Sequence, residues 1–135
     1  MGAPTITNND LGNGIIALGE FESQLMTSAG AATYLDNTLV AMDTSTLKLV
    51  PYVKGGSTNG NGVIYGILTN GFAAAGAGDT AVRVVTGPNT KIVKDYLVIH
   101  ADGDASNVDN AVKLLAIDVG INIVESKDLH VADNS

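Results

Sequence analysis

Three carboxylates stand close together in residues 101–109, ADGDASNVD, and this is the stretch whose residue types come nearest to a metal-binding motif. Asp102, Asp104 and Ser106 match the first three ligand positions of a calcium-binding loop, in which oxygen atoms surround the ion. The later positions do not match, because Asn107 replaces the required glycine and a lysine stands where the bidentate glutamate belongs. We therefore predict an acidic turn that caps a helix, with no metal and no cofactor.

Two histidines, His100 and His130, are the only imidazoles available for acid–base chemistry. The chain lacks the G-x-S-x-G sequence that exposes a nucleophilic serine, and a single histidine at the end of a strand is typically structural. Two glycine-rich stretches, residues 55–62 and 71–80, contain neither a phosphate-binding loop nor the full dinucleotide spacing. We interpret both as mobile loops between strands, and we expect no enzymatic activity.

The elements that would position these residues are mainly β-strands. Short apolar runs bounded by turn residues recur from Tyr34 onward, at a spacing typical of a small barrel or sandwich. Asp43 and Ser45 favour a tight turn between the first two runs, because their side chains bond to nearby backbone amides. Pro51 cannot donate a ladder hydrogen bond, so we expect it at an edge or a bulge. The predicted strands are residues 39–42, 47–53, 63–68, 81–85 and 96–100.

One helix is predicted over residues 107–119, where apolar residues recur at helical spacing. Ser106 or Asp104 can cap its first turn, and Gly120 fits the position just past its end. The alternating residues of INIVES then predict a last strand. The fold class is therefore mainly β with one short C-terminal α-helix, whose apolar face comprises Val108, Ala111, Val112, Leu115 and Val119.

The first 32 residues lack a regular period, because Asn, Asp, Gly and Ser residues interrupt it, and they predict a flexible N-terminal arm. Within the arm, residues 14–21, GIIALGEF, have enough apolar and β-branched content to form a strand if a sheet edge is offered. A frayed terminus is the alternative that stays open. The expected organisation is an arm over residues 1–32, a β-rich domain over residues 33–125 and a polar tail over residues 126–135.

Composition limits the partners of the chain. Its 135 residues suit one domain, and 45% hydrophobic residues supply a folded core. A net charge of -7, with no Lys or Arg before Lys48, disfavours nucleic acid as a partner, because binding to phosphates depends on basic residues. No apolar run approaches the roughly 18 residues that a membrane-spanning helix needs. The absence of cysteine is compatible with synthesis in a reducing cytoplasm.

Three short segments in a fixed order carry a resemblance to a known family. Asp43-Thr44-Ser45, Lys48-Leu49-Val50 and Gly66-Ile67-Leu68 resemble the core signature of bacteriophage head decoration proteins, the family typified by protein D of phage lambda. Residues 96–124 are similar too, since that family has a strand, an acidic turn, a short helix and a final Ile/Val strand. The resemblance covers about residues 34–124. The Pro51-Tyr52 pair, the long 71–80 loop and the arm differ from the family pattern.

The resemblance implies a small β-clip or β-tulip domain that forms a homotrimer over threefold positions of an expanded icosahedral shell. Its partner would be the major capsid protein, and it would act as a cement protein on the outer surface of the phage head after synthesis in the host cytoplasm. We expect the arm to add a strand to the capsid through apolar contacts of Ile6, Ile15, Ile16 and Leu18.

A virion-surface glycan-binding or host-attachment module is the alternative that stays open, because small β domains with glycine-rich loops often carry such sites. The chain has four tyrosines and no tryptophan, which weighs against a stacking platform for sugars.

Overall fold

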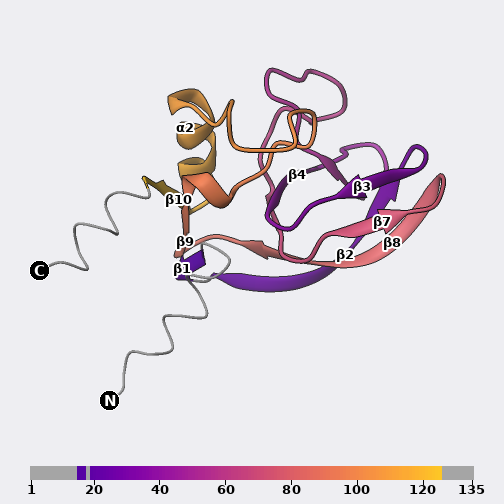
Figure 1. Ribbon diagram of the computed structural model, residues 1–135, viewed down its shortest axis with the longest axis horizontal. Coiled ribbons are helices and arrows are strands. Elements are labelled where there is room, and N and C mark those ends of the chain that lie inside the picture. Colours follow the sequence, from indigo (N-terminus) through magenta and orange to yellow (C-terminus); the bar gives the residue numbers. More distant parts are fainter. Residues whose placement is uncertain (1–14, 18, 126–135) are drawn as a thin grey trace, which may run out of the picture.

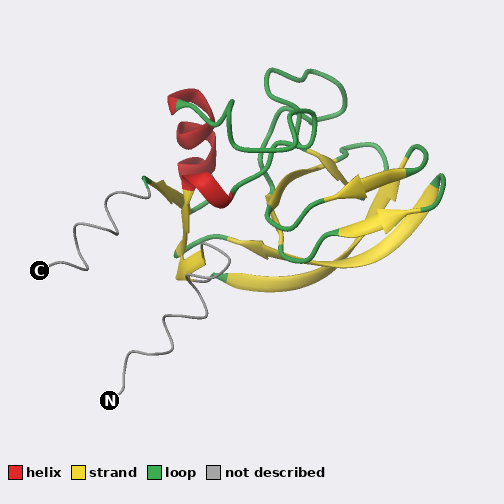
Figure 2. Ribbon diagram, viewed as in Figure 1, coloured by secondary structure: helices red, strands yellow, loops and turns green. Residues whose placement is uncertain are grey.

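The computed structural model describes residues 15–17 and 19–125, with side chains from Gly19 to Glu125. The described part is mainly β, with one α-helix near its C-terminal end, as the sequence predicts (Figures 1 and 2). The strands are β1 (Ile15–Ala17), β2 (Glu20–Ser28), β3 (Ala32–Tyr34), β4 (Thr38–Met42), β5 (Leu49–Pro51), β6 (Gly66–Leu68), β7 (Phe72–Ala74), β8 (Gly78–Thr86), β9 (Thr90–Val93) and β10 (Ile121–Val124). The helices are the short 3₁₀ helix η1 (Lys94–Tyr96) and α2 (Asn110–Asp118).

Five strands close into a barrel in the order β2-β5-β4-β6-β8, which confirms the barrel among the predicted architectures. β2 and β8 pair antiparallel along their full length, from Glu20 opposite Thr86 to Ser28 opposite Gly78, and form the long curved ribbon of Figure 1. β4 pairs antiparallel with both β5 and β6. The barrel closes where β5 runs parallel to β2 at a single pair, Met26 with Leu49.

Two smaller sheets complete the fold. β9 lies between β1, to which it is antiparallel, and β10, to which it is parallel. This sheet and α2 lie together at one end of the molecule (Figure 1). β3 and β7 form a two-stranded sheet whose residues Tyr34, Ala32, Phe72 and Ala74 pack on the core that includes Met26.

The molecule contains two hydrophobic cores, one on each face of β4, β6 and β8. Consecutive residues of these strands alternate between the cores, and because both faces are covered, the strands read as continuous apolar runs. One core joins Val40, Leu68 and Val84 with Met26, Leu49 and Val82 inside the barrel. The other joins Leu39, Ile67 and Val85 with residues of α2, β9 and β10, including Val112, Ala116, Ile92 and Ile121.

The helix begins later than predicted. α2 starts at Asn110, and its N-cap is Asp109, whose Oδ1 accepts a hydrogen bond of 3.2 Å from the Val112 amide. The two predicted caps, Ser106 and Asp104, instead bond to each other in the preceding turn, where Asp104 accepts a 2.9 Å bond from the Ser106 amide. The predicted C-terminal glycine is confirmed, since Gly120 has a φ of +81° just past the helix.

The N-terminal boundary also differs from the prediction. The predicted arm, residues 1–32, contains β2, which belongs to the barrel, and β1, which pairs with β9. The inward row of β2 is Glu22, Gln24, Met26 and Ser28, so only one inward side chain is apolar. Because polar residues occupy the inward row, the alternation that predicts a half-buried strand is lost.

Three further segments depart from the predicted pattern. The stretch 71–80, interpreted as a mobile loop, holds β7 and the start of β8. The stretch 96–100, predicted as a strand, makes only isolated bridges at Val98 and Ile99. β9 lies in a segment for which the sequence predicted no strand.

The predicted turn after β4 is present. The Asp43 Oδ1 atom accepts bonds of 2.8 Å from the Ser45 amide and 2.7 Å from the Ser45 hydroxyl. This turn joins β4 to β5, and Pro51 is the last residue of β5, beyond its single pair with β2. The position of Pro51 therefore agrees with an edge, where a missing amide donor costs little.

Candidate functional site

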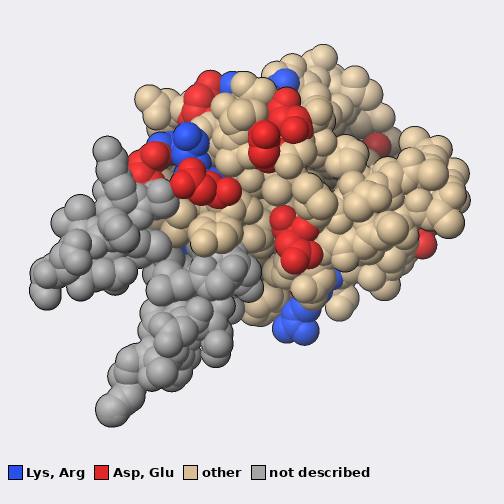
Figure 3. Space-filling view, viewed as in Figure 1, with Lys and Arg blue, Asp and Glu red and all other residues tan. Residues whose placement is uncertain are grey.

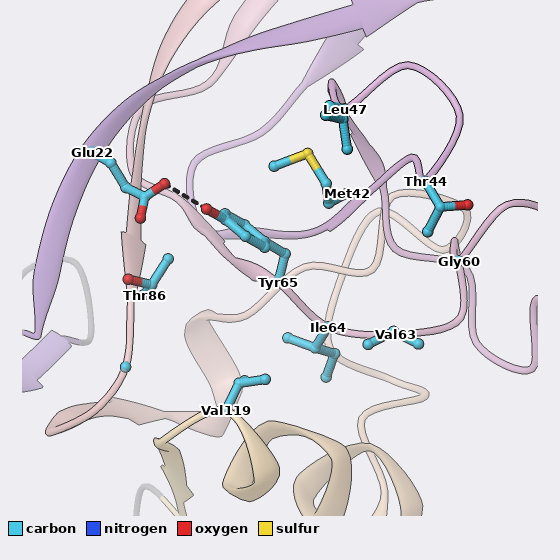
Figure 4. Close-up of a pocket in the computed structure, with 11 residues that line it drawn as sticks. Glu22, Met42, Thr44, Leu47, Gly60, Val63, Ile64, Tyr65, Thr86 and Val119 are labelled. Atoms are coloured by element: carbon cyan, nitrogen blue, oxygen red, sulfur yellow. Dashed lines mark hydrogen bonds between the residues drawn. The ribbon is translucent and has the colours of Figure 1, made fainter.

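A groove at the barrel is lined by residues of β2, of the end of β4 and of the segment before β6. It has a volume of about 520 Å³. Its lining comes from several segments far apart in the sequence, as Figure 4 shows. The lining residues are Glu22, Met42, Thr44, Leu47, Gly60, Val63, Ile64, Tyr65, Thr86, Gly87 and Val119.

The groove is mostly apolar and has one acidic end. The Tyr65 hydroxyl donates a 2.5 Å hydrogen bond to Glu22 Oε2, and the Gln24 amide donates another of 2.7 Å to the same oxygen. These two bonds hold the pKa of Glu22 below its ordinary value. Burial, and then the Glu22 carboxylate, raise the pKa of Tyr65 to about 12, so the phenol stays neutral at physiological pH.

Two large apolar side chains on the groove are open to solvent. Leu47 is 70% exposed and Val63 is 59% exposed. Leu47 also has a φ of +60°, a conformation that bulky side chains rarely adopt. An exposed leucine with a strained backbone adds little buried area to the hydrophobic core. Its presence therefore makes the groove a candidate contact surface.

A second hollow lies at the end of the molecule formed by β9, β10 and α2. It is lined by Asn89, Thr90, Lys91, Ile117, Gly120, Ile121 and Asn122. Ile117 is 56% exposed, and its neighbour on the helix surface, Leu114, is 64% exposed. Figure 3 shows wide uncharged areas between scattered acidic and basic side chains on one face of the molecule.

The sequence did not single out the residues of either hollow. Val63 and Tyr65 fall in a predicted strand, where their apolar character suggests burial, and Leu47 follows the Asp43 turn with no sign of its positive φ. The pairing of Glu22 with Tyr65 joins residues 43 positions apart and depends on barrel closure. No local pattern carries that information.

The predicted arm residues are only partly described. Ile15 and Ile16 lie in β1, and Ile15 pairs with Ile92 of β9 in the same chain. Ile6 and Leu18 lie outside the described residues. β1 borders β9 on one side, and no other strand of the described residues pairs with its second edge. An unpaired strand edge is a surface to which another chain can add a strand.

Two of the residues weighed for metal binding and catalysis, His100 and Asp104, make contacts within the fold. His100 packs on Tyr34 with a 4.7 Å distance between ring centroids, and His130 lies outside the described residues. Asp104 is engaged in its own turn, where the Ser106 side chain and amide lower its pKa. Among the described residues, no group of three or more His, Cys, Asp or Glu side chains is placed to hold a metal ion.

A third hollow of about 290 Å³ has polar residues that a sugar site would need, with Asp43, Thr58, Asn61 and His100 in its lining. The carboxylate of Asp43 is occupied by the Ser45 turn, and Asn61 Oδ1 accepts a 3.1 Å bond from the Thr58 amide. These polar groups hold loops in place, and the hollow offers no specific support for glycan binding.

Comparison of the chain with protein-family models and with the curated proteins finds no match. In the part of the chain that the structure describes, neither helix has the length and apolar character needed to cross a membrane.

Proposed function

We propose that this protein is a decoration protein of a bacteriophage head, which binds the major capsid protein as a homotrimer at threefold positions of the expanded shell. It works by adhesion on the outer surface of the head and stabilises the shell against rupture. The enzyme and nucleic-acid classes are not proposed, for want of a catalytic constellation in the described residues and because of the net charge of -7.

The observation that carries the proposal is the arrangement of the three segments that resemble the decoration family. The Asp43 turn joins β4 to β5, the Lys48 segment leads into β5, and residues 66–68 are β6. Since β4 pairs with both β5 and β6, the three segments form one continuous piece of the barrel. Segments scattered over 26 positions of sequence therefore belong to a single structural unit, as a shared family core requires.

Adhesion at several points explains how weak contacts can hold a shell. A trimer that touches several capsomers forms its later contacts at high effective concentration, so the whole attachment outlasts any single contact. β1 lies within the proposed capsid-binding arm, and its edge that pairs with no described strand would offer one such contact through backbone hydrogen bonds. The acidic surface of each copy also favours solubility and repels DNA.

Binding to purified phage heads and binding to a glycan panel separate this function from its main alternative. We expect the labelled protein to co-sediment with expanded heads of its phage and to give no signal on the glycan panel. Specific glycan binding without attachment to heads would overturn the proposal and favour a host-attachment module.

A further inference from the structure

The groove presents an apolar rim beside an anion that lacks a cationic partner. Both hydrogen bonds that Glu22 accepts come from neutral groups, Tyr65 and Gln24, and none of the ion pairs of the described residues includes Glu22. Leu47 and Val63 stand open to solvent on the same groove. A complementary surface would therefore supply an apolar side chain and a positive charge (Figure 4).

The second hollow presents the opposite combination. The Lys91 side chain is exposed, and its ammonium group forms no hydrogen bond or ion pair with any residue in the described part of the chain. Ile117 lines the same hollow and is 56% exposed. The second hollow thus supplies the apolar side chain and the positive charge that would complement the groove. Both surfaces are present on every copy of the chain.

The two surfaces adjoin. Gly87 and Val119 line the groove, whereas Gly120 lines the second hollow. The backbones are in close contact here, because a Cβ atom on Gly87 would lie 1.9 Å from the Val119 carbonyl oxygen. Two adjoining surfaces of one copy can both be covered by neighbouring copies in a closed ring, with the shared backbone segment directed toward the axis.

We propose that the chain self-associates head to tail, with Ile117 of one copy seated against Leu47 and Val63 of the next and Lys91 paired with Glu22. The two surfaces differ, so the contact is heterologous and generates a ring when the rotation closes. The ring size of three rests on the proposed function. The contact itself rests on the complementary charges and exposed apolar residues described above.

A charge exchange tests the contact. At micromolar concentration and about 0.15 M salt, we expect light scattering to show an oligomer for the natural sequence. Glu22→Lys and Lys91→Glu should each weaken association by about tenfold or more, and the double variant should restore it. Asp102→Lys is the matched control, because it makes the same charge change at an exposed turn and should leave association unchanged. Circular dichroism checks that each variant is folded.

A covalent trap provides a second readout that leaves Glu22 and Tyr65 intact. The chain has no cysteine, so Leu47→Cys with Ile117→Cys introduces the only two thiols. Oxidation should give disulfide-linked oligomers that end at a closed ring, whereas Leu47→Cys with Ala101→Cys should give none.

Three outcomes overturn the contact: a natural sequence that remains monomeric, folded single variants that associate like the natural sequence, or a cysteine pair that does not cross-link. Failure of the proposed function has a different signature. An oligomer with this contact that does not bind phage heads refutes the decoration function alone. A chain that is monomeric in solution but binds heads as three copies at each threefold position refutes the contact alone.

Discussion

Tyr65 and Glu22 form a polar pair at the wall of an otherwise apolar groove, and the pair gives the molecule a defined pH response. The Tyr65 pKa rises from 10.0 to about 12 in the folded chain, chiefly because of burial and then because of Glu22. Its contribution to stability is therefore fully present below pH 10 and is lost as the pH rises toward 12. The Glu22 pKa is lowered, so its contribution is present above the ordinary value of 4.5 and is lost in acid.

Replacing one member of the pair should change this response in a predictable direction. We expect Glu22→Gln to lower the Tyr65 pKa from about 12 while leaving it above 10.0, because burial remains the larger cause. Spectrophotometric titration of tyrosinate, with Tyr65→Phe as the reference that lacks this step, measures the change. An unchanged Tyr65 pKa in Glu22→Gln would contradict the hydrogen-bonded pair.

Asp109 combines two roles at the start of α2. Its carboxylate pairs with Lys54 at 2.6 Å and accepts the Val112 amide, and these contacts, the lysine first, hold its pKa below 3.8. We expect Asp109→Ala to lower the midpoint of denaturant unfolding at neutral pH. The difference from the natural sequence should shrink as the pH falls through the lowered pKa, because the protonated carboxyl no longer pairs with Lys54.

The double variant Asp104→Ala with Ser106→Ala is the control for the cap. It removes the bond within the preceding turn but leaves the Asp109 cap in place, so the loss of stability should be smaller. A larger loss in the control than in Asp109→Ala would show that the helix is capped from the turn instead.

At the scale of elements, burial on both faces distinguishes the central strands from β2. Leu68 of β6 is fully buried inside the barrel, whereas Leu25 of β2 is 45% exposed. We expect Leu68→Ala to lower the free energy of unfolding by about 2–5 kcal/mol. Leu25→Ala should change it by under about 0.5 kcal/mol in urea unfolding. Similar losses for the two variants would contradict the separation into a barrel core and an open outer face.

The same distinction explains what the sequence could predict. β4, β6 and most of β8 are apparent as apolar runs because both of their faces pack on cores. β2 is not apparent, because its inward side chains are mostly polar. Their hydrogen bonds come from outside the strand: the Tyr65 hydroxyl bonds Glu22, and the Tyr34 hydroxyl bonds Ser28, the last residue of β2. The helical spacing of apolar residues predicts α2. Its first residue is not predicted, because it depends on which of several nearby Asp and Ser side chains caps the helix.

Truncation of the predicted arm tests the pairing of β1 and β2. Deletion of residues 2–22 removes β1 and the first three residues of β2, which pair with Val84, Val85 and Thr86. We expect this deletion to cost roughly 2 kcal/mol or more, since each lost hydrogen bond contributes about 0.5–1.5 kcal/mol. Deletion of residues 2–14 spares both strands and should leave the melting temperature nearly unchanged while weakening attachment to heads. Equal melting temperatures for the two truncations would contradict the pairing of β1 and β2.

At the scale of the whole molecule, the proposed attachment would depend on geometry that no single copy contains. A site that spans several capsomers exists only when they have the correct separation, so the shell itself would determine when the protein binds. One ring that touches several capsomers would convert weak contacts of the arm, β1 included, into a durable attachment. We therefore expect the protein to discriminate between shell states and not simply to adhere to capsid protein.

Co-sedimentation with compact precursor shells and with expanded shells of the same phage measures this discrimination. We expect saturable binding to expanded shells, at a stoichiometry of three copies per threefold position, and no binding to compact precursors. The truncation of residues 2–14, which spares the described fold, should bind expanded shells much more weakly. Equal binding of the full chain to both shell forms, or no binding to either, would contradict the account.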